Sequence, residues 1–503
     1  MLLPMSESNS IFISGQLLFK RIIVIIILTT THTQAQENIH ENHVVLFGNL
    51  HAHSELSDDV YVNDGSMLPL IAFQSAMNSG LDFLAISDHH KAVDSNHRLF
   101  MTNAEYAEKL YDVAMDFNLQ NIGNFIAIPA IEWGNTATGN HLNIFGAKTP
   151  PPDSILDKDY NDILAWAAQN AEFIQYNHPN SWKGKSNRNK EVGNFGEGLF
   201  SSTADFATAS NQVSKTFTII ASVHKGHISG EHKESTAKTH RDVHAKHFKL
   251  YLEYLNKGLH ISPAANQDTH RTNWGSVTAA RTAVWAEEMS YSSLMQGIIA
   301  NRIYATEDDE LAVVAKVRIS ETEYWMGEIV PMANDETDIE LLVKIWQTDG
   351  SDNDDTDEGP YTVNVFFDDD GIGGSKAREL VTFTSLAANI QHNLPLTVSP
   401  DTYLFIQVTE ENGKDNPIGD GEDEQNNQND NLEADGKRDD MNDSAWTTPF
   451  WFSSEIATDT FAWSIRSSIY HDKICWAVKR IGQANYRESS TPPTNKTKHN
   501  CHE

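Results

Sequence analysis

Short apolar runs alternate with amphipathic stretches over the first half of the chain. Buried strands of a parallel sheet have this form, because both of their faces are covered. The alternation predicts about seven β/α units arranged as a parallel sheet or barrel. The runs are HVVLFGNLH (43–51), LDFLAISDH (81–89), FIAIPAIEW (125–133), HLNIFG (141–146), EFIQYNH (172–178), FTIIASVH (217–224) and GLHISPAANQD (258–268).

The stretches between these runs carry helix signals. MLPLIAFQSAMNSG (67–80) and DVHAKHFKLYLEYLNKG (242–258) both close on a glycine, which suits a helix C-terminus. NAEYAEKLYDVAMDF (103–117) opens on Asn103, a favoured N-cap residue. RTAVWA (281–286) and a helix around 290–302 end this part of the chain.

The pattern changes at about residue 313, from where β-type runs are joined by polar connections. These runs predict a β-sandwich-like domain after the barrel. They are IELLVKIWQ (339–347), YTVNVFFD (361–368), ELVTFTS (379–385), TYLFIQVTE (402–410) and AWTTPFWF (445–452).

A chain of 503 residues is too long for one ordinary core, so two or three domains are expected. We assign residues 40–312 to the barrel, 313–455 to the β-sandwich-like domain and 456–503 to a small C-terminal module. Residues 1–35 are interpreted as a signal peptide, because Lys20 and Arg21 precede the apolar run 22–28 and Thr33–Ala35 offers small residues for cleavage. A retained membrane anchor is the alternative. The signal predicts a secreted or periplasmic protein with no stable membrane span after its removal.

The formal net charge of −33 argues against nucleic acid or an anionic membrane as a partner. Much of it lies in two acidic connections, 349–359 and 415–443. Their Asp and Asn oxygens suit Ca²⁺, but a solvated loop is the favoured interpretation. The only cysteines, Cys475 and Cys501, are free to pair outside the cytoplasm.

Candidate chemistry gathers where the apolar runs end. In a parallel barrel the carboxyl ends of the strands converge on one mouth. His51 and His53 stand two residues apart, so both imidazoles project to one side of a strand. Metal-ligand residues recur at or beside the ends of the other runs: Asp88, His89, Glu132, His141, His178, Asp268 and His270. The recurrence predicts one metal centre.

Five ordered motifs resemble those of the PHP (polymerase and histidinol phosphatase) superfamily, in particular its secreted branch of carbaryl-hydrolase-like metallohydrolases. They are HAHSELSD (51–58), LDFLAISDHH (81–90), AIEWGNTATGNHLNIFG (130–146), QYNHP (175–179) and NQDTH (266–270). The resemblance implies a distorted seven-stranded, TIM-like β/α barrel with two or three metal ions. Asn49, where the family often has Asp, and Asp59, where it often has Gly, depart from the pattern.

The resemblance also implies three metal positions. One takes His51, His53, Glu132 and Asp268; a second takes Glu132, His141 and His178; a third takes Asp58, His89 and His270. Imidazole mixed with carboxylate suits zinc, manganese or iron. Asp88 is interpreted as a partner that orients a ligand histidine rather than as a ligand itself.

Residues outside the ligand set offer further roles. His224 and His227 are candidates for a proton donor or substrate contact, or are loop histidines. Arg271 is placed to bind an anionic group, or pairs with a carboxylate. His240, His244 and His247 share one helical face, for which a surface or loop-covering face is favoured over another metal site. Residues 183–216 are interpreted as a loop over the site.

The expected activity is hydrolysis by a hydroxide that bridges two cations. We weigh three hypotheses: a phosphoesterase, a hydrolase of carboxylic or carbamic aryl esters, and a noncatalytic binding protein. Arg271, Lys91 and Lys183 at the mouth would favour a phosphate substrate. An apolar pocket lined by Trp133, Trp182 or Trp274 would favour an aryl ester. The substrate is a small-molecule ester in either enzymatic case.

Overall fold

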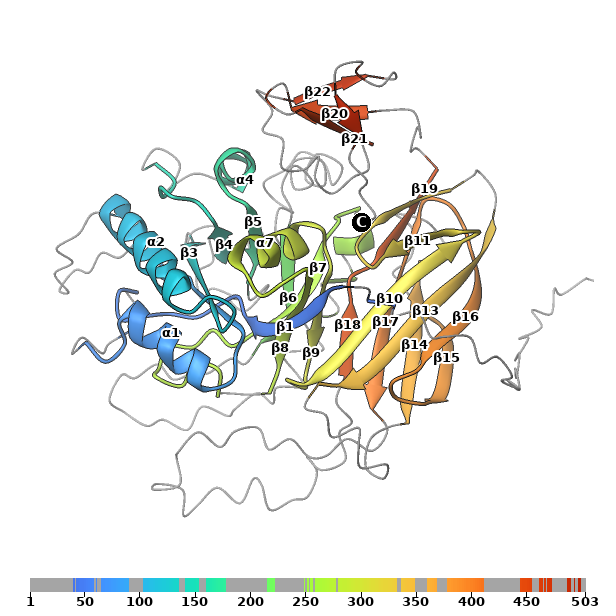
Figure 1. Ribbon diagram of the computed structural model, residues 1–503, viewed down its shortest axis with the longest axis horizontal. Coiled ribbons are helices and arrows are strands. Elements are labelled where there is room, and N and C mark those ends of the chain that lie inside the picture. Colours follow the sequence, from blue (N-terminus) through green and yellow to red (C-terminus); the bar gives the residue numbers. More distant parts are fainter. Residues whose placement is uncertain are drawn as a thin grey trace, which may run out of the picture. The chain divides into compact units, whose positions relative to one another are not determined.

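The computed structural model contains a mixed α/β protein with one large sheet and few helices (Figure 1). The described residues are 39–40, 42–57, 60, 65–89, 103–134, 141–152, 160–177, 215–221, 248, 251–252, 254–256, 258–276, 279–332, 336–348, 360–368, 378–410, 444–454, 461–464, 466, 468–472, 486–489, 493 and 496–498. The signal segment, both cysteines, the two acidic connections, most of the loop 183–216 and the histidines from 224 to 247 lie outside them.

Each of the seven predicted apolar runs overlaps a strand. These strands are β1 (Val44–Asn49), β2 (Phe83–Ile86), β3 (Ile126–Gly134), β4 (His141–Phe145), β5 (Phe173–Tyr176), β6 (Lys215–Ala221) and β7 (Ser262–Asn266). They neighbour one another in chain order. β4 is antiparallel to both β3 and β5, and the other neighbours are parallel. Because β1, β2 and β3 are parallel, their carboxyl ends meet at one edge.

The predicted closed barrel is not confirmed, because no ladder among the described residues joins β7 to β1. The free edge of β1 is taken by β8 (Arg281–Ala286), which pairs with it antiparallel from Val44 to Gly48. β9 (Ile303–Thr306) follows on β8. A single bridge, Ala52 to Thr269, links the chain after β1 with the chain after β7. The sheet is therefore open, although its first and seventh strands meet just past their ends.

The helices with named bounds in the described part of the chain are α1 (Pro69–Asn78), α2 (Asn103–Gln120), α4 (Tyr160–Asn170) and α7 (Tyr291–Ile299). α1 buries Pro69, Ala72, Phe73 and Ala76, which is the spacing of one helical face. This face packs with α2, β2 and β3 in one core, and α1 and α2 lie side by side in Figure 1. No helix in the described ranges reaches the length and apolar character needed to cross a bilayer.

The C-terminal half is built from strands. A four-stranded sheet contains β11 (Thr322–Trp325), β10 (Leu311–Ile319), β13 (Thr337–Gln347) and β16 (Gln391–Val398). The large sheet continues through β12 (Ile329–Pro331), β14 (Tyr361–Phe367), β15 (Arg378–Leu386), β17 (Thr402–Glu410), β18 (Ser444–Thr447) and β19 (Phe450–Ser453). The two sheets share one apolar core, with alternate residues of β14 facing it.

The large sheet passes without a break across residue 313, because β18 pairs antiparallel with β9. Strands from both sides of the boundary assigned at residues 312 and 313 thus belong to one sheet. The domain boundaries assigned from the sequence remain predictions. A last small sheet contains β20 (Phe461–Ser464), β21 (Ile469–Asp472), β22 (Tyr486–Ser489) and β23 (Thr497–Lys498).

Candidate metal centre

Backbone pairing brings the end of β1 against the end of β7. The amide of Asp268 donates to the carbonyl of His51 at 3.0 Å, and the amide of His53 donates to the carbonyl of Thr269 at 2.9 Å. Asp268 adopts a left-handed conformation with φ of 48°, which is uncommon outside glycine and is a form of strain that often marks functional positions. The pairing and this turn place the Asp268 carboxylate beside the imidazoles of His51 and His53.

A second pairing joins the ends of β2 and β3. The backbones of His89 and Glu132 form an isolated parallel β-bridge, in which the amide of Glu132 donates to the carbonyl of Asp88 at 3.0 Å. In the β3–β4 ladder, Gly134 faces His141, so this histidine stands two residues along from Glu132 on the neighbouring strand. Local register thus gathers side chains from the ends of five strands, β1, β2, β3, β4 and β7.

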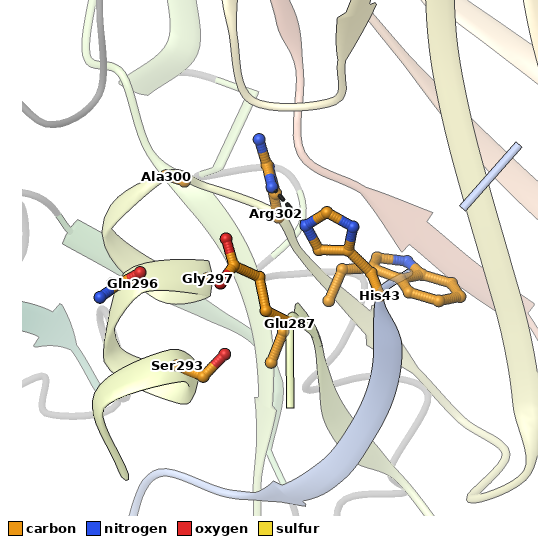
Figure 2. Close-up of a pocket in the computed structure, with 9 residues that line it drawn as sticks. His43, Glu287, Ser293, Gln296, Gly297, Ala300 and Arg302 are labelled. Carbon is orange, nitrogen blue, oxygen red and sulfur yellow. Dashed lines mark hydrogen bonds between the residues drawn. The ribbon is translucent and has the colours of Figure 1, made fainter. Parts of the chain in front are cut away.

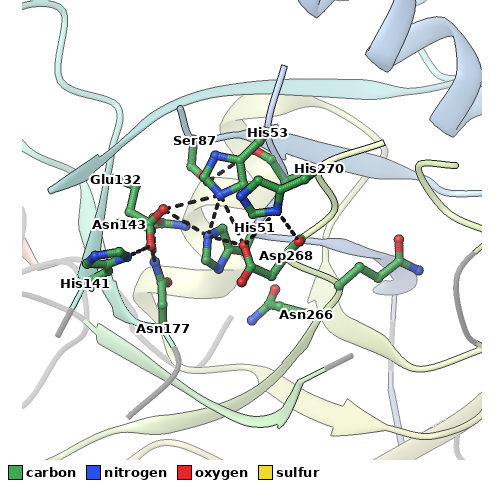
Figure 3. Close-up of polar contacts among 12 residues, drawn as sticks. His51, His53, Ser87, Glu132, His141, Asn143, Asn177, Asn266, Asp268 and His270 are labelled. Carbon is green, nitrogen blue, oxygen red and sulfur yellow. Dashed lines mark hydrogen bonds and ion pairs between the residues drawn. The ribbon is translucent and has the colours of Figure 1, made fainter. Parts of the chain in front are cut away.

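The first cluster contains His51, His53 and Asp268 (Figure 3). The Nε2 atoms of the two histidines lie 3.2 Å apart. Oδ1 of Asp268 lies 3.2 Å from Nε2 of His51 and 3.1 Å from Nε2 of His53. Three potential ligand atoms therefore face one point.

The second cluster contains His89, Glu132 and His141. Oε1 of Glu132 lies 2.8 Å from Nδ1 of His141, and Oε2 lies 3.4 Å from Nδ1 of His89. The same Oε2 lies 3.4 Å from Nε2 of His51 and 3.3 Å from Nε2 of His53. Glu132 is therefore shared between the first and second clusters.

Glu132 is fully buried, and its ionisation depends on the surrounding histidines. Burial opposes the charge, but the imidazoles of His141, His51 and His89 and the hydrogen bond with His141 hold the pKa of Glu132 well below its usual range. The site therefore keeps a carboxylate, which is the form that binds a cation.

The third cluster contains His53, His89 and His270, whose ligand atoms all lie within 4.8 Å of one another. The His53 and His270 rings stack with centroids 4.1 Å apart. Nδ1 of His270 also lies 3.8 Å from Oδ1 of Asp268. His89 and His270 were expected to share a position with Asp58, which lies outside the described residues.

The donor set fits a divalent transition metal. Two donors that each lie about 2.1 Å from a tetrahedral zinc ion are about 3.4 Å apart. The separations from 3.1 to 3.4 Å around His51, His53, Glu132 and Asp268 are close to that value. Imidazole nitrogens mixed with carboxylate oxygens suit zinc, manganese or iron better than magnesium or calcium.

Ser57, which the sequence did not single out, contacts a ligand histidine. Its hydroxyl lies 3.0 Å from Nδ1 of His53, on the far side of the ring from the clusters. The expected partner, Asp88, has Oδ1 at 3.9 Å from that nitrogen. Its two oxygens accept hydrogen bonds at 2.6 Å from the amide and the hydroxyl of Ser54. Asp88 therefore braces the turn after His53, and Ser57 is closer to the ring.

The remaining predicted site residues fall into two groups. Arg271 is exposed and follows His270 directly, beside the third cluster. Asp58, His178 and His224 lie outside the described residues, as do Lys91, Lys183 and Trp182.

Asn49 is one of the two departures from the PHP motifs, and the other, Asp59, lies outside the described residues. Asn49 ties the ends of β1 and β7 together. Its Oδ1 accepts hydrogen bonds from the amides of His51 at 3.1 Å and Gln267 at 3.2 Å. An amide side chain performs this bracing without adding a charge next to the clusters.

A small pocket lies away from these clusters, at the amino end of β1 (Figure 2). Its lining includes His43, Glu287, Gln296 and Arg302, and Arg302 is hydrogen-bonded to His43 at 2.6 Å. The volume of about 10 Å³ is about that of one water site. This pocket therefore cannot hold an ester substrate.

No family model and no curated protein matches the chain. Among solved structures, a two-domain protein from Bacteroides vulgatus, described as containing a predicted PHP-like metal-dependent phosphoesterase, is 13% identical; the match covers 74% of this chain and 92% of that chain, with a TM-score of 0.36. PsfC from Pseudomonas syringae is 14% identical over 48% of this chain and 82% of its own, with a TM-score of 0.29. TM-scores of this size establish neither a common fold nor a common activity.

Proposed function

We propose that the protein is an exported metal-dependent hydrolase of the PHP superfamily and that it acts as a phosphoesterase. The single observation that carries this proposal is the position of Glu132, a buried carboxylate with imidazole nitrogens against both of its oxygens. A carboxylate shared in this way offsets the repulsion between two cations held close together.

The described residues divide into two metal-binding sets that share Glu132. His51, His53 and Asp268 would hold one divalent ion, and His89 and His141 would hold another. His178 would join the His141 set, and Asp58 and His270 would form a third set. His89 lies within reach of the second and third sets and would serve one of them. Such ions, when bound, supply a water acidic enough to act as a nucleophile near neutral pH and a Lewis acid for the substrate oxygen.

The chain's own side chains have separate tasks around this centre. Arg271 binds the anionic group of the substrate, for which a planar guanidinium is well suited. Asp88 holds the turn that carries His53, through its two hydrogen bonds to Ser54. His224 is proposed as a proton donor to the leaving group.

Two tryptophans favour a phosphoester over an aryl ester. Trp133 and Trp274 are both completely buried, and the indole nitrogen of Trp274 donates to the carbonyl of His53 at 3.0 Å. They therefore support the fold of the site and offer no aromatic wall to a substrate. Exposed Arg271 beside His270 suits a phosphate instead.

The basic pair Lys20 and Arg21 before the apolar run 22–28 supports export. The net charge of −33 supports a small-molecule ester rather than a nucleic acid as the substrate.

The test is an activity panel on the purified chain, stripped by a chelator and reloaded separately with Zn²⁺, Mn²⁺ or Fe²⁺. The substrates are an aryl phosphomonoester, an aryl phosphodiester, an aryl carboxylate ester and an aryl carbamate. We expect metal-dependent hydrolysis with the highest kcat/KM on a phosphoester. A preference for the carboxylate ester or carbamate would favour the alternative hydrolase, and activity that survives complete chelation would contradict metal catalysis.

A further inference from the structure

A row of buried polar side chains runs across the sheet next to Glu132. In the β3–β4 ladder Asn143 stands opposite Glu132, and in the β4–β5 ladder Gln175 stands opposite Asn143. Asn177 follows β5 directly. The three amide side chains are completely buried, so their hydrogen bonds must be made within the protein.

The direction of these hydrogen bonds is set by a backbone carbonyl. The carbonyl of Leu50 accepts from Nδ2 of Asn143 at 3.1 Å and from Nε2 of Gln175 at 3.4 Å, and a carbonyl can only accept. Oδ1 of Asn143 is therefore left to accept from Nδ2 of Asn177 at 2.7 Å. Nε2 of Gln175 also donates to Oδ1 of Asn177 at 3.0 Å. The NH₂ group of Asn177 must then face Glu132.

That NH₂ group donates to Oε1 of Glu132 at 2.8 Å (Figure 3). Oε1 is the oxygen next to His141, whereas Oε2 faces His51, His53 and His89. A rotation of the carboxylate would break the hydrogen bond with Asn177. The amide therefore holds Oε1 toward His141 and leaves Oε2 toward the other three histidines.

We propose that Asn177 is a positioning residue of the metal centre, which locks the carboxylate of Glu132 so that it serves both metal positions. This inference rests on the proposed function, because it requires that Glu132 bind metal. Loss of the donor frees Oε1 to turn away from His141. Partners of this kind typically contribute 10- to 100-fold to metal affinity. The position beside His141 should therefore weaken by about 10- to 100-fold, and the position of His51 and His53 by less than about 3-fold.

Two substitutions and one control isolate the donor. Asn177→Leu keeps the approximate volume and removes the donor, whereas Asn177→Ala leaves room for a water that can replace part of it. Asn118→Ala is the control, because Asn118 makes two amide hydrogen bonds with the backbone of Ala127 on the same strand β3, at 2.6 and 2.9 Å, away from the clusters. Asn118→Ala thus also removes two side-chain amide hydrogen bonds, but neither of them involves Glu132.

The experiment is a Zn²⁺ titration of the metal-free full-length chain in competition with a chromophoric chelator. Wild type, both Asn177 variants and Asn118→Ala are compared, each alone and combined with His141→Ala. We expect one class of Zn²⁺ to weaken in Asn177→Leu, a smaller effect in Asn177→Ala, and none in Asn118→Ala. In the His141→Ala background, Asn177→Leu should change nothing further.

Equal weakening of both Zn²⁺ classes, an additive effect in the His141→Ala background, or wild-type affinity in a folded Asn177 variant would overturn the role of Asn177. If Asn177→Leu does not fold, Asn177→Ala decides by the same criteria. A wild-type chain that binds no Zn²⁺, with Mn²⁺ and Fe²⁺ also unbound, would instead overturn the proposed function itself.

Discussion

Glu132 is the side chain on which the contacts of the site converge. Its two carboxylate oxygens contact four histidines and one asparagine. Its backbone amide donates to the carbonyl of Asp88. A charge buried this deeply would be very unfavourable without such partners. The surrounding histidines stabilise the buried negative charge of Glu132, and the arrangement suits a bound cation.

Asp88 stabilises the turn after His53, and this role makes a prediction about folding stability. Asp88→Ala removes two short hydrogen bonds from Ser54 to a buried carboxylate, so the free energy of unfolding should fall by about 3 kcal/mol. Ser54→Ala keeps the backbone donor and should lose only about 1.5 kcal/mol. Urea unfolding of both variants measures the difference. Equal losses, or no loss in Asp88→Ala, would show that Asp88 does not hold this turn.

At the scale of the strands, Gly48 sets how closely β1 approaches β2. A Cβ at Gly48 would overlap the carbonyl oxygen of Phe83, its partner in the ladder. Gly48→Ala should therefore push the strands apart and lower the free energy of unfolding by about 3 kcal/mol. Gly80→Ala is the comparison, because its φ is +83° but open space surrounds it, and its cost should be only about 1 kcal/mol. Denaturant unfolding that ranks Gly80→Ala as the more damaging change would contradict this packing.

Asp82, at the entry to β2, gives the fold a dependence on pH. Burial raises the pKa of Asp82 from its ordinary 3.8 to about 6, although the Phe47 amide and Arg281 act in the opposite direction. A raised carboxyl pKa means that stability is lost as the pH rises from about 4 through 6. Asp82→Asn keeps an acceptor for the Phe47 amide and should be more stable than wild type by about 2 to 3 kcal/mol above pH 6.5, but not at pH 3.5. The measurement is the free energy of unfolding of both proteins from pH 3.5 to pH 7. A constant difference between the two proteins over this range would contradict the account.

Most of the strands were predictable from the sequence because an apolar run marks them, but the apolar run of β10 (LAVVAKVRI) was not among those predicted. β1 to β7 and β13, β14, β15 and β17 all fall within or around predicted runs. β16 was missed because only Leu394 and Val398 of its eight residues are buried, so it leaves no apolar run. The run 445–452 divides into β18 and β19, with Thr448 and Pro449 between them. The open sheet was not predictable, because the hydrophobic pattern does not reveal that β8 pairs with the edge of β1.

The ligand histidines were predictable from the sequence, whereas the buried amides around them were not. His51, His53, His89 and His141 stand at strand ends, where chemistry is expected. The amides of Asn143 and Gln175 lie inside strands, and their only signal is a polar residue within an otherwise apolar run, as in HLNIF and FIQY. Ser57 carried no signal, because a serine in a loop is ordinary.

At the scale of the whole molecule, the apolar core crosses the predicted domain boundary. One buried cluster combines Tyr251, Leu255 and Ala305 with Phe405 and Trp446. The pairing of β9 with β18 joins the same two regions. Residues 40–455 should therefore unfold as one cooperative unit, seen by calorimetry as a single main transition whose calorimetric and van't Hoff enthalpies agree. Two well-separated transitions of comparable enthalpy would show that the halves are independent domains.

The metal content of the purified chain tests the central claim most directly. Elemental analysis of wild type should give at least two equivalents of zinc, manganese or iron per chain, and Glu132→Gln should lose at least one of them while remaining folded. The shared carboxylate is the physical reason, since its loss affects both clusters at once. A wild-type chain that contains no transition metal, takes up none after reloading, and is indistinguishable from Glu132→Gln would contradict the account.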